Sequence, residues 1–152
     1  MAKPTILDKL NDILRHEWTG VAQYAQAGFL ISGLWRVAFA EKFFESAKES
    51  FGHAQKIGDK IVAMGGVPTI ERNQIKQSND LSEMLQFGYE FESGAVKLYQ
   101  EALALAEGDR PLVILLEDIL LEEQEGAEEM AKFLKEHKSA AGASTSEARK
   151  SG

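Results

Sequence analysis

Apolar residues recur along most of this chain at spacings that alternate between three and four positions, which is the pattern of helices packed in a bundle. Four stretches carry such a stripe: residues 7–31, 43–61, 81–105 and 112–133. The second stripe belongs to a helix that we expect to run from about Trp35 to Met64. The pattern therefore predicts an all-α protein built as a four-helix bundle.

Residues that start and stop helices flank these stripes. Thr5 and Asp8 match a capping box at the start of the first helix. The Gly-Gly pair at residues 65–66 supplies a stop after the second helix, and either Asn79 or Asp80 can cap the third. These signals place the ends of the helices close to the ends of the stripes.

The connections between the stripes differ in length. Ser32 and Gly33 allow a tight reversal, so the first two helices are expected to be antiparallel neighbours. Gly108 ends the third helix and Asp109 caps the fourth. Residues 67–79 form the longest connection and show little periodicity, so we expect a long crossover that runs the length of the bundle between the second and third helices.

The last part of the chain differs from the rest. Residues 138–152 are rich in Ser, Ala and Gly and carry no apolar stripe. We therefore expect residues 1–137 to form the bundle and residues 138–152 to form a polar C-terminal tail that is mobile or loosely docked.

Each apolar stripe is interrupted by polar residues where a buried helix face would be apolar. The interrupting residues are Glu17, Ser50, His53, Glu92 and Glu123. A carboxylate buried in an apolar seam is costly unless it is paired or binds a metal ion. We therefore expect the carboxylates to meet inside the bundle.

The spacing of these residues is close to that of a di-metal site. In di-metal carboxylate bundles, two helices each supply one Glu and the other two each supply Glu-x-x-His, all facing inward. Here the two motifs read Ser50-x-x-His53 and Glu123-x-x-Gly126, so one lacks its Glu and the other lacks its His. The remaining candidate metal ligands are Glu17, His53, Glu92 and Glu123.

Composition limits the partners and the compartment. The chain has 152 residues, enough for one domain with a sizeable core, and a formal net charge of −7. That charge argues against binding nucleic acid through a broad basic surface, and the lack of cysteine excludes thiolate metal sites and disulfides. No apolar run approaches the length of a membrane span. We expect a cytoplasmic protein that binds neither membranes nor nucleic acid.

Local motifs add a family resemblance. Glu17 is followed one heptad later by Gln23 and Tyr24, the second helix carries His53-Ala54, and Gly-Gly-Val-Pro follows that helix. The third predicted helix carries Glu92 and, farther along, Gln-Glu-Ala at residues 100–102. The fourth carries Leu-Glu-Glu at residues 121–123, which ends on Glu123. In order and spacing, residues 7–134 resemble the ferritin superfamily, and bacterioferritins most closely.

The resemblance implies a hollow shell, usually of 24 subunits, that stores iron, and a di-iron site within each subunit that oxidises ferrous iron. One metal position would keep Glu17, His53 and the shared Glu123, and the other only Glu92 and Glu123. An imidazole with two carboxylates is adequate for iron, manganese or zinc. The expected cofactor is therefore iron, mono- or di-nuclear, or another divalent metal. Tyr24 is implied as a redox-active neighbour of the metals, with plain core packing as the alternative.

Other positions bear on haem and assembly. The family holds haem between two subunits through a Met directly after the first motif's Glu, and Phe51 stands there in this chain, so haem is not expected. Trp18 and Phe29 widen the apolar face of the first helix. That extra width predicts either a subunit interface or a broader internal core. We expect His16 and His137 to be exposed and without a role.

Glu49, Glu122 and Glu125 lie near the predicted site, but each is about one helical position off the inward stripe.

The predicted function is iron binding and storage in an oligomeric shell, with an incomplete ferroxidase site whose ability to oxidise iron stays open. The shell is a homo-oligomer or is shared with a second ferritin-like subunit that carries a complete site. One alternative is a non-catalytic structural or partner subunit of such a shell. Another is a redox or oxidative-stress enzyme built on the same bundle. Metal content separates a metal-binding subunit from a structural one, and the size of the assembly separates a shell from a smaller redox enzyme.

Overall fold

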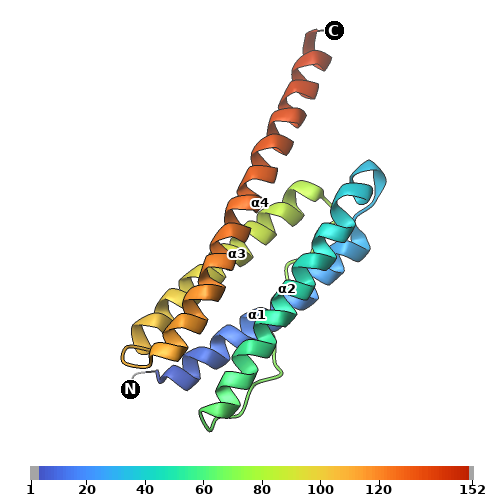
Figure 1. Ribbon diagram of the computed structural model, residues 1–152. Coiled ribbons are helices and arrows are strands. Elements are labelled where there is room, and N and C mark those ends of the chain that lie inside the picture. The colour runs from blue at the N-terminus through green and yellow to red at the C-terminus, as the bar shows by residue number, and fades with distance from the viewer. Residues whose placement is uncertain (1–3, 151–152) are drawn as a thin grey trace.

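The computed structural model describes residues 4–150, with side chains described as far as residue 135. In this range the chain forms four α-helices, namely α1 (Ile6–Leu30), α2 (Arg36–Ala63), α3 (Leu81–Leu105) and α4 (Arg110–Lys150). A short 3₁₀ turn, η1 (Gly33–Trp35), precedes α2. α1 packs against α2 and α3 packs against α4, each as an antiparallel pair (Figure 1). The prediction of an all-α four-helix bundle is confirmed.

Side-chain caps fix where the helices begin. The Thr5 hydroxyl accepts a hydrogen bond from the Asp8 N–H (3.1 Å), and the Asp8 carboxylate accepts one from the Thr5 N–H (3.0 Å). The predicted capping box is therefore present. Asp80 caps α3 and Asp109 caps α4, each through its carboxylate. After α2, Gly65 adopts a φ of 86°, a conformation that favours glycine and ends the helix.

The connection between α2 and α3 runs the length of the bundle, as predicted (Figure 1). Because residues 64–80 return the chain to the end where α2 began, α2 and α3 point in the same direction, while α1 and α4 point the opposite way. The crossover therefore brings the second helix pair against the first with its polar positions at the same level.

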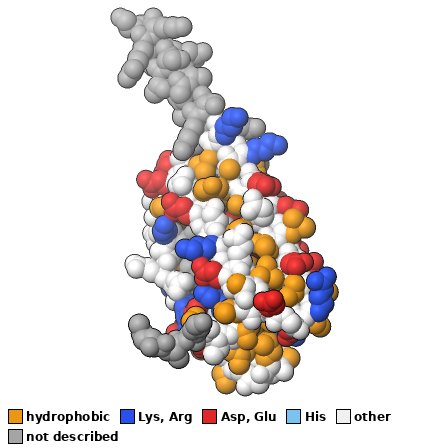
Figure 2. Space-filling view, turned by 90° about the vertical axis from the view of Figure 1, so that its left-hand side faces the viewer, with side chains coloured by type: hydrophobic (Ala, Val, Ile, Leu, Met, Phe, Trp, Pro, Cys, Tyr) orange, Lys and Arg blue, Asp and Glu red, His pale blue; other side chains and the backbone are white. Residues whose placement is uncertain are grey.

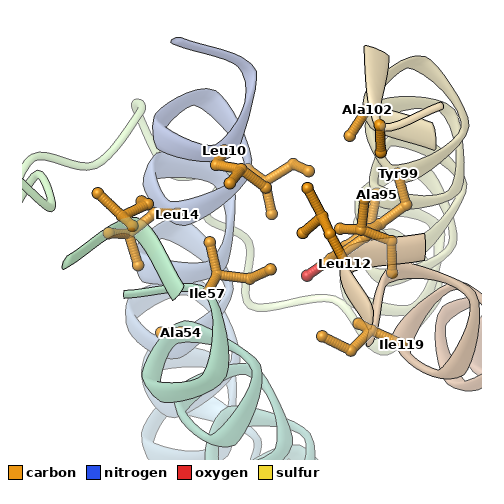
Figure 3. Close-up of a cluster of buried hydrophobic side chains, with 13 residues drawn as sticks. Leu10, Leu14, Ala54, Ile57, Ala95, Tyr99, Ala102, Leu112 and Ile119 are labelled. Carbon is orange, nitrogen blue, oxygen red and sulfur yellow. The ribbon is translucent and has the colours of Figure 1, made fainter. Parts of the chain in front are cut away.

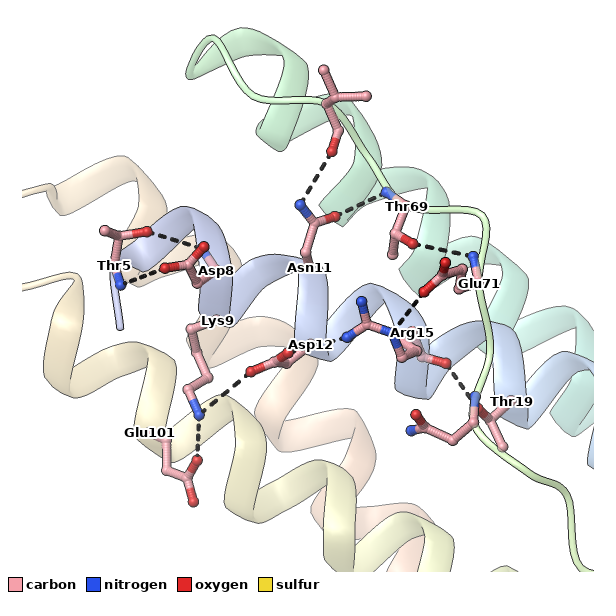
Figure 4. Close-up of polar contacts among 12 residues, drawn as sticks. Thr5, Asp8, Lys9, Asn11, Asp12, Arg15, Thr19, Thr69, Glu71 and Glu101 are labelled. Atoms are coloured by element: carbon pink, nitrogen blue, oxygen red, sulfur yellow. Dashed lines mark hydrogen bonds and ion pairs between the residues drawn. The ribbon is translucent and has the colours of Figure 1, made fainter. Parts of the chain in front are cut away.

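Polar side chains on α1 hold this crossover in place. Asn11 makes two hydrogen bonds to the crossover backbone, of 3.1 and 2.9 Å (Figure 4). Farther along, Thr19 accepts from the Asn73 N–H (2.8 Å) and Gln23 accepts from the Lys76 N–H (2.9 Å). Backbone groups without regular secondary structure thus find partners on the neighbouring helix, as buried backbone requires.

The apolar core is divided into two clusters. One surrounds Leu10, Ile57 and Leu116, where side chains from both helix pairs point toward one another (Figure 3). The other surrounds Phe43 and Leu85. Along every helix, the predicted site residues lie between the parts that enter these two clusters. The fold therefore has a polar layer inside the bundle, enclosed by apolar packing above and below.

α4 extends farther than the stripe pattern predicts. Its backbone remains helical to Lys150 and passes through most of the segment expected to be a separate polar tail (Figure 1). Side chains beyond residue 135, including that of His137, lie outside the described part of the chain. The division of the chain into residues 1–137 and 138–152 stays a prediction.

Candidate metal centre

The residues that the sequence predicts as metal ligands are buried in the polar layer. The exposed fraction is 0% for Glu17, 3% for His53, 9% for Glu92 and 2% for Glu123. Each comes from a different helix. The two antiparallel pairs therefore both contribute to the layer, as the stripes indicated.

Glu17, His53 and Glu123 lie close enough together to share a metal ion. His53 Nδ1 is 2.8 Å from Glu123 Oε1 and 3.6 Å from Glu17 Oε2. One possible ligand atom from each residue lies within 4.8 Å of the other two. Glu17 Oε2 is buried and has no hydrogen-bond partner among the described residues. A buried oxygen without a partner is costly, and a cation held by the three side chains would satisfy it.

Two buried tyrosines hold the carboxylates across the helix pairs. The Tyr99 hydroxyl, on α3, donates to Glu17 Oε1 on α1 (3.1 Å). In the opposite sense, the Tyr24 hydroxyl on α1 donates to Glu92 Oε1 on α3 (2.8 Å). The two contacts are related in sequence, because each tyrosine follows the carboxylate of its own helix by one heptad. Tyr24 thus contacts Glu92, and its role as a redox neighbour stays a prediction.

Glu92 lies beside Glu123 but is not one of the three residues whose ligand atoms converge. It belongs to neither of the groups of three side chains in the described residues that could hold a metal ion. Its carboxyl group lies against α4 at Gly126, where an added Cβ would be 3.1 Å from Glu92 Cδ. Burial, together with the hydrogen bond and charge of Glu123, raises the pKa of Glu92 to about 10. At neutral pH in the metal-free protein, Glu92 therefore holds a proton.

His53 faces a second pair of carboxylates through its other nitrogen. Nε2 lies 2.6 Å from Glu122 and 3.9 Å from Glu49, and these three residues form the second group that could hold a metal ion. Along the sequence, Glu49 and Glu122 lie off the inward stripe, and their side chains are about half exposed. Their long side chains reach His53 from the rim of the site, which the helical period alone could not show.

The charges of this cluster are balanced by protons when no metal is bound. Burial lowers the pKa of His53, but the hydrogen bond to Glu123 and the negative charges of Glu17 and Glu123 outweigh it and raise the pKa to about 11. Burial, followed by the charge of Glu17, raises the pKa of Glu123 to about 7. Metal ions bind neutral imidazole and ionised carboxylate, so binding at this cluster releases protons.

His16 departs from expectation. It is partly buried between α1 and α3, where its ring stacks on Phe91 with centroids 4.1 Å apart. Its Nε2 donates to the backbone oxygen of Phe91 (2.9 Å). The prediction that His16 is exposed is wrong, because a flanking position on α1 becomes covered when α3 packs beside it.

The donor set suits a limited range of metals. One imidazole and two carboxylates provide nitrogen and oxygen ligands, which iron, manganese and zinc accept. The residues present therefore fit a divalent transition-metal ion at the position formed by Glu17, His53 and Glu123.

Within the described part of the chain, no helix is long and apolar enough to cross a membrane.

Comparisons with known proteins agree with this architecture. The family model of the ferritin-like domain matches residues 7–140. A bacterioferritin from Rhodobacter capsulatus is 32% identical over 99 residues, which cover 64% of this chain and only 61% of that protein's length. A nutrient stress-induced DNA-binding protein from a Nostoc species is 27% identical over 141 residues, covering 85% of this chain and 77% of that protein.

A solved structure is similar over most of the chain. The crystal structure of a ferritin-like, diiron-carboxylate protein from Bacillus anthracis superposes with a TM-score of 0.82 and 28% sequence identity. The match covers 85% of this chain and 94% of that one.

The raised pKa of Glu92 predicts how the stability of the metal-free protein depends on pH. The pKa of Glu92 in the folded protein lies above the ordinary value of 4.5. The stability that its protonated carboxyl group contributes to the folded protein is therefore fully present below pH 4.5 and is lost as the pH rises through about 10. Between pH 7 and 9, this group lowers the free energy of unfolding by on the order of 1 kcal/mol per pH unit. Glu92→Gln has no proton to lose and removes that slope.

Urea unfolding of both proteins in chelator, at one subunit concentration and at pH 7, 8 and 9, measures this difference. We expect Glu92→Gln to gain stability relative to the wild type by about 2–3 kcal/mol over the two pH units. His53 stays protonated in both folded proteins over this range, so its contribution cancels in the comparison. A stability difference that stays constant from pH 7 to 9 would show that Glu92 is already ionised in the folded protein.

Proposed function

The chain belongs to the family of ferritin-like domains, and on that basis we propose that it binds iron and stores it as a subunit of an oligomeric shell. The observation that carries this proposal is the convergence of Glu17, His53 and Glu123 inside the bundle, where a buried oxygen of Glu17 has no hydrogen-bond partner among the described residues. In a structural subunit without a metal, three ionisable groups buried at this point would carry a desolvation penalty that no cation offsets.

The residues of the chain have distinct parts in this proposal. Glu17 and Glu123 supply the negative charge that offsets a divalent cation. The Tyr99 hydroxyl holds one oxygen of Glu17 and leaves the other directed at His53. Glu122 accepts a hydrogen bond from His53 Nε2. This hydrogen bond keeps a proton on Nε2, so Nδ1 can act as a ligand once Nδ1 has released its own proton. A ferrous ion held here would supply the electron that dioxygen takes when iron is oxidised.

We propose that this oxidising activity is weaker than that of a complete di-iron site, or is completed by a second ferritin-like subunit. Ser50 and Gly126 stand where the full pattern has Glu and His. A redox enzyme on the same bundle remains the alternative, and the size of the assembly separates the two. Cytoplasmic location and the absence of haem stay predictions.

The name of the Nostoc relative describes DNA binding, but the charge of this chain favours no such role. The formal net charge is −7. On the face that Figure 2 shows, the coloured Lys and Arg side chains are scattered among acidic and hydrophobic ones and form no broad basic area. Non-specific DNA binding depends on clustered cations that neutralise phosphates. We therefore keep iron binding as the proposed function.

The outer face of α1 and α2 supports assembly. Phe51 is 44% exposed and lies beside Trp18, with ring centroids 5.9 Å apart. Together with Val62, Pro68 and Ile70, these two rings line a groove of about 250 Å³. Exposed apolar surface of this kind marks interfaces, so we propose that a second subunit covers this groove.

Metal binding at the centre is tested with His53→Ala. Anaerobic titration of the metal-free protein with ferrous ion should show a loss of affinity of at least about 100-fold, since outer-sphere partners alone contribute about 10–100-fold. Glu125→Gln is the matched control, because it removes an exposed carboxylate of α4 close to the centre. Equal affinity in wild type, His53→Ala and Glu125→Gln would contradict the proposed site.

Assembly through the α1–α2 face is tested with Phe51→Asp. Two carboxylates brought together across a two-fold interface would be desolvated and repel each other, so size-exclusion chromatography with light scattering should show subunits or small oligomers. Leu121→Asp is the control, because Leu121 is an exposed apolar residue, 60% accessible, on the other helix pair. If Phe51→Asp retains the mass of the wild-type assembly, this face is not the interface.

A further inference from the structure

We infer that each subunit holds one metal ion at this centre, not two, because the chain's own side chains fill the second position of a paired site. The inference rests on the proposed metal site of Glu17, His53 and Glu123 and narrows it. Three features of the polar layer support it, namely the placement of Glu92, the packing around Ser50 and the sharing of His53.

The first feature is the placement of the Glu92 carboxyl group. Its Oε1 accepts the hydrogen bond from the Tyr24 hydroxyl, at 2.8 Å. Its Oε2 lies 3.2 Å from the point where a Cβ of Gly126 would be. Gly126 stands three residues after Glu123, where a second imidazole would rise from α4 in the complete pattern. The Glu92 carboxyl group therefore crowds the point from which a second imidazole would extend.

The second feature is the packing around Ser50. A Cβ placed on Gly20 would lie 2.5 Å from the Ser50 hydroxyl oxygen and 2.3 Å from the ring of Phe91. The Ser50 hydroxyl on α2 and the Phe91 ring on α3 therefore both lie against the backbone of α1 at Gly20, which has no side chain. The Phe91 ring is held there by the stacked ring of His16. Apolar packing thus borders position 50, where the complete pattern has a bridging carboxylate.

The third feature is that the two possible ligand groups share one imidazole. Among the described residues, the inner group is Glu17, His53 and Glu123, and the outer group is Glu49, His53 and Glu122. A neutral imidazole has one nitrogen with a free lone pair and one that carries hydrogen. When Nδ1 serves the inner group, Nε2 donates to Glu122 and cannot hold a second ion. The two groups are therefore alternatives for one ion.

The inner group is the favoured one of the two. Its residues are all buried, whereas the side chains of Glu49 and Glu122 are about half exposed. Water therefore competes less for the inner donors. The buried Glu17 oxygen that has no hydrogen-bond partner among the described residues also belongs to the inner group. Glu92 supports the centre by packing and hydrogen bonding, and does not act as a ligand.

The test is the stoichiometry of Co²⁺, which has a visible spectrum and is not oxidised under the conditions of a titration. Metal-free wild-type assembly is titrated by calorimetry, and the ions retained after desalting are counted by elemental analysis. We expect one tightly bound ion per subunit. Two tightly bound ions would overturn the inference and leave the proposed metal binding intact. No bound ion would overturn the proposed function itself.

Matched variants identify which carboxylate is a ligand. Glu92→Gln keeps the shape of the side chain and its acceptor for Tyr24, so it should retain one ion with an affinity within about threefold of the wild type. Glu123→Gln should lose the ion, and circular dichroism with chromatography verifies that both variants fold and assemble. If Glu92→Gln loses the ion or drops the count from two to one, Glu92 is a ligand and the inference fails.

Discussion

The contact between His53 on α2 and Glu123 on α4 joins the two helix pairs at the least favourable place for charge, inside the bundle. The two side chains are 2.8 Å apart and nearly inaccessible to water. Removing either partner would leave the other buried group less well compensated, which costs more than the pair itself. The arrangement of the polar layer, its tyrosines and its protons follows from the need to balance these groups when no cation is present.

The fold supplies the surroundings that such a layer requires. The long crossover, held by Asn11 and its neighbours on α1, makes α2 and α3 point the same way. Each carboxylate of α1 and α3 then meets the tyrosine of the other helix. The two apolar clusters enclose the layer from both ends and exclude water from it. The three ligand side chains already lie within reach of one another without a metal, as a preorganised centre requires.

Much of this architecture can be predicted from the sequence. Helical spacing finds the four helices, the caps find their starts, and polar interruptions of the stripes find Glu17, His53, Glu92 and Glu123 as buried. The period of a helix cannot show which carboxylates come within reach of one another, because that depends on how the helices pack and on side-chain length. The contact of Glu122 with His53 and the stacking of His16 on Phe91 were missed for this reason.

The placement of Glu92 also depends on packing, because its carboxyl group lies against Gly126 of α4. A crystal structure of the manganese-loaded protein, with anomalous diffraction data, tests the centre most directly. We expect an anomalous peak between His53 Nδ1 and the carboxylates of Glu17 and Glu123, at about 2.0–2.3 Å from each, as is usual for such ligands. A loaded crystal with no peak there, or with its peak between Glu49 and Glu122, would contradict the metal centre described for this bundle.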